Sequence, residues 1–150
     1  MTPNVDERLA SIVRALTDVV LPALPPEAGL AREQVELSLG QLQIMRAQLD
    51  GSFAFEADEL ADARALGEKL ATLSGDGSLA EPLAAAKSAA TPAEIRAARV
   101  SIHAAIHDLI PVASRHLAMF GAIMKAEKAR VVKDRAWFAP FGFDIAPPEA

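Results

Sequence analysis

Apolar residues recur every three or four positions along most of this chain, in blocks that end at proline or glycine. This spacing matches the turn of an α-helix, whereas a half-buried strand would alternate apolar and polar residues. The composition agrees, because 32 of the 150 residues are alanine and the aromatic residues are six phenylalanines and one tryptophan. Alanine favours helices, and β-branched and aromatic residues favour strands. The sequence therefore predicts an all-α fold.

Start and stop signals divide the chain into four long helices and a short one. Asn4 with Glu7, and Thr91 with Glu94, have the spacing of capping boxes, which satisfy free amides at a helix start. Pro111 interrupts the longest pattern, because its ring removes an amide and clashes with the preceding turn. The predicted helices cover residues 4–21, 27–50, 56–74, 78–90 (the short one) and 91–136, with the last divided or kinked at Pro111.

We expect these helices to pack as one antiparallel up-and-down bundle over residues 1–136, followed by an aromatic tail over residues 137–150. A chain of this length can bury a substantial core without disulfides or metals. Beyond Pro111, the pattern predicts that the core-facing residues are Ala113, Leu117, Phe120 and Met124.

The second predicted helix has two apolar faces. Its first face carries Val35, Leu39, Leu42, Met45 and Leu49. Its reverse side carries Leu30, Leu37 and Ile44 at heptad spacing, with Gly40 between the last two. Two apolar faces require two partners. Either this helix lies at the centre of the bundle, or its second face is buried against another chain, and Gly40 would allow close approach of a backbone.

Four of the seven aromatic residues fall within seven positions near the C-terminus: Trp137, Phe138, Phe141 and Phe143. Large rings carry much apolar surface, so we expect this tail to dock. The favoured interpretation is that it folds back on its own bundle, and the alternative is that it docks on a second subunit or a partner protein.

His103 and His107 are four residues apart, which is the spacing of helical zinc and iron sites. The glutamate of the HExxH motif is absent between them. His116 follows His107 by nine residues, which on an unbroken helix places it about half a turn round, on the opposite side. The favoured interpretation is that both rings flank the core. No cofactor is predicted, and a divalent metal held by this pair is the alternative.

Arg96 and Arg99 share one side of the same helix with the two histidines. Such grouped donors can bind a carboxylate or a phosphate. They can equally form ion pairs within the fold, and the favoured interpretation is pairing with the acids of the third helix: Asp58, Glu59 or Asp62.

The formal net charge is −5, with a pI near 5.2, which argues against general nucleic-acid binding. No apolar run is long enough to span a membrane, and no basic leader precedes an apolar segment, so we expect a cytoplasmic protein. Residues 125–135 carry five basic side chains against two acidic ones. We assign these to the negative end of the helix dipole and do not expect a membrane partner. The weaker alternative is peripheral contact with an anionic membrane through this helix and the aromatic tail.

The sequence has no phosphate-binding glycine loop, no nucleophile elbow and no cysteine. We therefore predict a non-enzymatic protein that acts through association, as a homodimer or with a protein partner. The predicted interface comprises Leu30, Leu37, Gly40, Ile44, Trp137, Phe138, Phe141 and Phe143. The alternative function is a metal- or small-anion-binding bundle that uses Arg99, His103 and His107.

Overall fold

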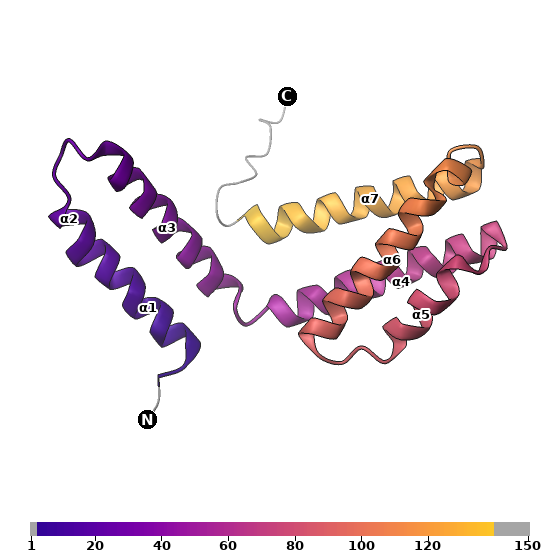
Figure 1. Ribbon diagram of the computed structural model, residues 1–150, viewed down its shortest axis with the longest axis horizontal. Coiled ribbons are helices and arrows are strands. Elements are labelled where there is room, and N and C mark those ends of the chain that lie inside the picture. The colour runs from indigo at the N-terminus through magenta and orange to yellow at the C-terminus, as the bar shows by residue number, and fades with distance from the viewer. Residues whose placement is uncertain (1–2, 140–150) are drawn as a thin grey trace. The chain divides into compact units, whose positions relative to one another are not determined.

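The computed structural model describes residues 3–139, and this part of the chain is helical without any strand. The all-α prediction is confirmed. The elements are α1 (Val5–Ala15), a π-helical segment (Leu16–Val20), α2 (Leu21–Ala23), α3 (Gly29–Gln48), α4 (Ser52–Ser74), a 3₁₀ turn (Gly77–Leu79), α5 (Ala80–Lys87), α6 (Pro92–Ala113) and α7 (Leu117–Phe138), as drawn in Figure 1.

The fold groups into two compact units, where the sequence predicts one domain over residues 1–136. Unit 1 is Met1–Ser52 and unit 2 is Phe53–Ala150. Each unit has its own internal packing, and each is described by itself.

Both predicted capping boxes are present. The Glu7 amide donates to Asn4 Oδ1 at 2.8 Å and the Asn4 amide donates to Glu7 Oε2 at 2.9 Å. At the start of α6, the Thr91 amide donates to Glu94 Oε2 at 2.9 Å and the Glu94 amide donates to Thr91 Oγ1 at 3.3 Å. Hydrogen bonds from the Ala90 and Thr91 amides lower the pKa of Glu94, because they favour its ionised form.

Unit 1 is an antiparallel hairpin in which α1 and its extension run alongside α3 (Figure 1). The guanidinium of Arg46 donates two hydrogen bonds to the Asp6 carboxylate, from Nε to Oδ1 at 2.7 Å and from Nη2 to Oδ2 at 3.1 Å. At the other end, Arg32 Nη1 donates to the carbonyls of Leu21 and Leu24, both at 3.1 Å. These contacts fix the register of the two helices at both ends.

The first helix passes beyond its predicted end at Leu21 and continues to Ala23. The Leu21 amide donates to the carbonyl of Leu16, five residues back, so the chain is in π-helical register just before Pro22. Pro22 then lies in the first turn of α2, where a missing amide is tolerated. The wider π turn therefore lets the helix accommodate a proline that we expected to end it.

Unit 2 holds the hydrophobic core, which lies among α4, α5, α6 and the start of α7. Leu70, Leu79, Ile102 and Met119 are fully buried at its centre. Gly67 lets α4 pack closely here, because a Cβ at this position would lie 3.1 Å from Leu83 Cδ2 and 3.4 Å from Ile102 Cγ2. The remaining buried apolar residues are Leu60, Ala63, Leu66, Leu83, Ala86, Ile95, Ala98, Ile106, Leu109, Ala113 and Ala122.

The break in the last long helical pattern was expected at Pro111, and the structure places it at residues 114–116 instead. Pro111 lies within α6, which ends two residues later at Ala113. The Ser114 hydroxyl donates to the Pro111 carbonyl at 3.0 Å, and the Arg115 and His116 amides donate to carbonyls three residues back. Proline so close to a helix end weakens the last turn without stopping the helix at the proline itself.

The displaced break also corrects the predicted core of α7. Ala113 is buried as expected, whereas Leu117, Phe120 and Met124 are 88%, 49% and 42% exposed. The three residues outside the helices at the break change the rotational phase, so extrapolating the α6 pattern selects the wrong side of α7. The buried side chains are Met119 and Ala122, with Ile123 and Ala126 partly buried beside them.

The short helix α5 begins at Ala80, two residues after its predicted start at residue 78. The Asp76 side chain accepts a hydrogen bond from the Ser78 amide at 2.7 Å and caps the 3₁₀ turn. Helix α5 then begins at Ala80 without a side-chain cap of its own.

Ile102 tests whether this core carries the stability of unit 2. Replacing the fully buried side chain, Ile102→Ala, should lower the free energy of unfolding by about 2–5 kcal/mol, because it leaves a cavity. Urea denaturation followed by circular dichroism measures the loss. The control Val100→Ala, on the same helix at 65% exposure, should change it by less than about 0.5 kcal/mol. Equal effects of the two changes would contradict the assigned core.

Candidate functional site

Unit 1 leaves one apolar face of α3 uncovered. Leu30 is 73% exposed and Leu37 is 56% exposed, while Ile44 of the same heptad series is half-buried. We call these three residues the outer stripe of α3. Gly40 lies between Leu37 and Ile44, and a Cβ built on it would meet no atom within 4 Å.

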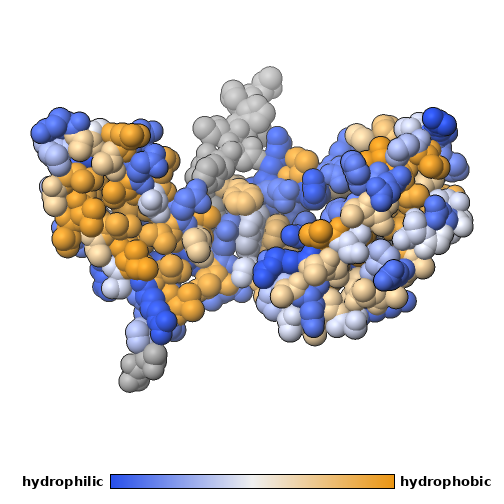
Figure 2. Space-filling model, viewed as in Figure 1, coloured by the Kyte–Doolittle hydropathy of each residue, from blue (hydrophilic) through white to orange (hydrophobic). Residues whose placement is uncertain are grey.

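The opposite side of α3 contacts the first helix, and even there the packing is shallow. Helices α1 and α3 contact each other, and Leu9 and Val13 of α1 and Val35 and Leu39 of α3 are half-buried. No residue between 3 and 52 is buried. Apolar residues spread over the face of unit 1 that Figure 2 shows. A two-helix unit therefore exposes apolar surface that folded proteins normally cover.

The aromatic residues of the predicted tail are only partly within the structure. Trp137 belongs to α7 and stacks on Phe55 of α4, with ring centroids 4.3 Å apart and an interplanar angle of 20°. Phe138 ends α7 and is 41% exposed. Phe141 and Phe143 lie outside the described residues. The Trp137 ring therefore packs on its own chain.

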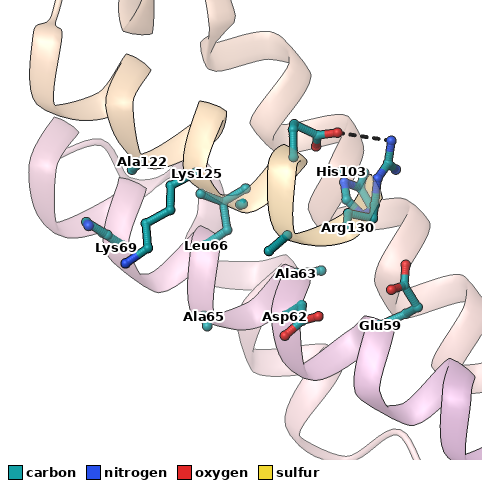
Figure 3. A pocket seen from close by; sticks show the side chains of 13 residues that line it. Glu59, Asp62, Ala63, Ala65, Leu66, Lys69, His103, Ala122, Lys125 and Arg130 are labelled. Carbon is teal, nitrogen blue, oxygen red and sulfur yellow. Dashed lines mark ion pairs between the residues drawn. The ribbon is translucent and has the colours of Figure 1, made fainter. Parts of the chain in front are cut away.

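Unit 2 contains a cavity of about 260 Å³ between α4 and α7, with His103 of α6 at one end (Figure 3). Its volume is slightly below the roughly 300–1,000 Å³ of typical ligand pockets. Its apolar lining consists of alanines and one leucine. Ala63, Leu66 and Ala122 are buried and Ala126 is half-buried, whereas Ala65 and Ala129 are exposed at the edge.

Glu59 is the buried charge of this cavity, with a side chain that is 9% exposed. Its Oε2 lies 3.7 Å from Arg99 Nη1, and its Oε1 lies 3.5 Å from Lys133 Nζ. Oε1 nevertheless accepts no hydrogen bond from the described residues. Two cations thus compensate a carboxylate that burial would otherwise make costly.

Lys133 joins α7 to α4 through two acids. Its ammonium is hydrogen-bonded to Asp62 Oδ2 as well as paired with Glu59. The Asp62 hydrogen bond, together with the charges of both carboxylates, raises the pKa of Lys133, so the lysine stays charged. This contact fixes the antiparallel register of α4 and α7.

His103 is half-buried beside this charged group. Burial lowers the pKa of His103 most, and the positive charges of Arg130 and Arg99 lower it further, whereas Glu127 and Glu59 oppose the shift. Arg130 itself pairs with Glu127 at 3.0 Å, the contact drawn as a dashed line in Figure 3. The imidazole is therefore neutral at pH 7, so one ring nitrogen can donate a hydrogen bond and the other can accept one.

The structure separates the four side chains that the sequence groups on α6. Arg96 pairs with Glu56 at 3.0 Å, and Arg99 pairs with Glu59, one of the three acids that the sequence suggested. His103 lines the cavity, but His107 does not and is exposed. Residues 3–139 contain no cluster of three or more histidine, aspartate or glutamate side chains placed to hold a metal ion.

Sequence reasoning missed the cavity and its other cations, Lys69 and Lys125. The signal lay in the spacing of Asp62, Leu66 and Lys69, which places them along one side of α4. Using it would have required knowing that α7 is the neighbour on that side.

Comparison with known proteins finds no match to a family, a curated protein or a solved structure. Among the helices of residues 3–139, none combines the length and the apolar character needed to cross a bilayer.

The titration of His103 tests the environment assigned to it. In an NMR titration its midpoint should lie below the ordinary value for histidine, and Arg130→Gln should raise the midpoint without restoring it, because burial is the larger cause. The sign for stability follows from this depressed pKa. The unfolded chain takes up the proton first, so this group lowers the stability of the fold as the pH falls below about 6.5. A midpoint at or above the ordinary value would contradict the assignment.

Proposed function

We propose that this protein acts by association and that its partner is a second copy of the chain, bound through the outer stripe of α3. The observation that carries the proposal is the exposure of Leu30 and Leu37 on a helix whose other apolar face already contacts α1. Helices with two apolar faces are stable where both are covered. A two-fold dimer covers the same surface on both copies.

Charge favours an antiparallel arrangement of the two α3 helices. With the two-fold axis at Leu37, Leu30 of one copy faces Ile44 of the other, and Glu33 falls level with Gln41. A parallel pair would instead place Glu33 level with its own equivalent. Because like charges placed opposite each other are unfavourable, the antiparallel pair is preferred.

Gly40 supports a close approach on this side. Glycine inside a helix costs roughly 0.5–1 kcal/mol relative to alanine. No atom of the described chain lies within 4 Å of a Cβ built there, so packing within the chain does not require glycine. The backbone of a partner helix can approach at this position.

The expected dimer is weak enough to dissociate on dilution. Covering Leu30 and Leu37 on both copies buries four leucine side chains, worth at most roughly 6–12 kcal/mol. Association itself costs an estimated 4–15 kcal/mol or so. The net free energy of association is therefore small, so the fraction of dimer should depend on protein concentration.

Sedimentation velocity over a range of concentrations tests the interface. The natural chain should shift from 15.8 kDa toward twice that mass as its concentration rises. The double change Leu37→Glu with Ile44→Glu should leave the monomer at every concentration, because it would bury four carboxylates in the interface. Circular dichroism checks that the helices persist.

The matched control places the same two charges elsewhere on α3. Ala31→Glu with Gln43→Glu changes exposed positions away from the outer stripe, so the dimer should survive. A natural chain that is monomeric throughout would refute the proposal. A dimer that persists in the Leu37 and Ile44 variant would show that another surface forms the interface.

A further inference from the structure

The cavity of unit 2 has an uneven distribution of charge. At the His103 end, Arg130 lines the cavity and pairs with Glu127. Arg99 and Lys133 are not lining residues, and they pair with the lining acids Glu59 and Asp62. At the other end are Lys69 and Lys125, and neither forms an ion pair within residues 3–139. The positive charge that is left over therefore belongs to these two lysines.

The register of α4 and α7 brings the two lysines together. Lys133 binds Asp62, and the helices run antiparallel from that contact (Figure 1). Lys69 follows Asp62 by seven residues, and Lys125 precedes Lys133 by eight, so they lie at nearly the same level. Figure 3 shows both at the same end of the cavity, away from His103 and Arg130.

The lining between the two ends is apolar because alanines lie on both helices there. Ala63 on α4 and Ala122 and Ala126 on α7 form its buried and half-buried part, and Ala129 lies exposed at its edge. Leu66, which is buried, is the one large apolar residue of this lining. The cavity therefore combines an apolar body with a cationic end, and its neutral His103 supplies a polar atom at the far end.

We propose that this cavity binds a small organic carboxylate with an apolar body, whose carboxylate lies between Lys69 and Lys125. Two ammonium groups from different helices provide up to six hydrogen-bond donors for one anion. The apolar lining of alanines and Leu66 covers the hydrocarbon part, and the limited volume selects a short chain. This site is separate from the outer stripe of α3 and does not depend on dimer formation.

Isothermal titration of the full chain with octanoate tests the site, with 1-octanol and acetate as probes that lack the charge or the apolar body. Octanoate should bind with one-to-one stoichiometry, and more tightly than either of the other two. Lys69→Met with Lys125→Met should weaken octanoate binding by about fivefold or more, since each exposed charge contributes modestly. Binding to the natural chain should also weaken with added salt.

Further variants test whether octanoate binds in the cavity itself. Lys87→Met with Lys128→Met removes the same charge from exposed lysines outside the cavity and should leave the affinity unchanged. Ala129→Leu should block binding by filling the cavity, while Ala118→Leu, an exposed α7 position outside it, should not. Absence of octanoate binding, or equal affinity in both double-lysine variants, would overturn the proposal.

Discussion

An amphipathic helix must cover its apolar face, and a hairpin of two helices can cover only the faces that meet. Unit 1 shows this limit directly. Its helices contact through half-buried side chains, and no residue from 3 to 52 is buried. Arg46 and Arg32 hold the hairpin in register at its ends through polar contacts. The proposed second copy of α3 would provide the missing layer.

Unit 2 covers the apolar faces of its helices with its own residues. Residues from α4, α5, α6 and α7 together surround Ile102, and Gly67 allows the close packing beside it. Small side chains have a second consequence where α4 faces α7. Alanines on both helices leave a cavity beside the ion pair of Lys133 with Asp62, and the lysines at its other end, Lys69 and Lys125, form no ion pair within residues 3–139. Small side chains in unit 2 thus allow both a close-packed core and a space for a ligand.

The starts of two helices were predicted correctly from the sequence, whereas the helix ends expected at prolines were not. The capping boxes at Asn4 and Thr91 involve residues three apart, so the printed sequence contains all of their chemistry. The end of α6 was misplaced because Pro111 lies only two residues inside it, and this error changed the predicted face of α7.

The outer stripe of α3 and the cavity of unit 2 differ in how far the sequence alone predicts them. The outer stripe of α3 follows from the heptad spacing of Leu30 and Leu37, which local periodicity reveals. The cavity required the pairing of Asp62 with Lys133, residues 71 positions apart. Nothing in either segment alone specifies that the two helices lie side by side, so Lys69 and Lys125 could not be brought together from the sequence.

The most direct test of the account is the distance between two copies of α3. The chain has no cysteine, so a single Ser38→Cys or Ala47→Cys change gives each copy one position for a spin label, and pulsed electron resonance measures the separation. The antiparallel dimer predicts a short distance at 38 and one longer by about 25–30 Å along the helix axis at 47. Short distances at both positions would contradict the antiparallel arrangement, and no coupling between copies at either position would contradict the dimer.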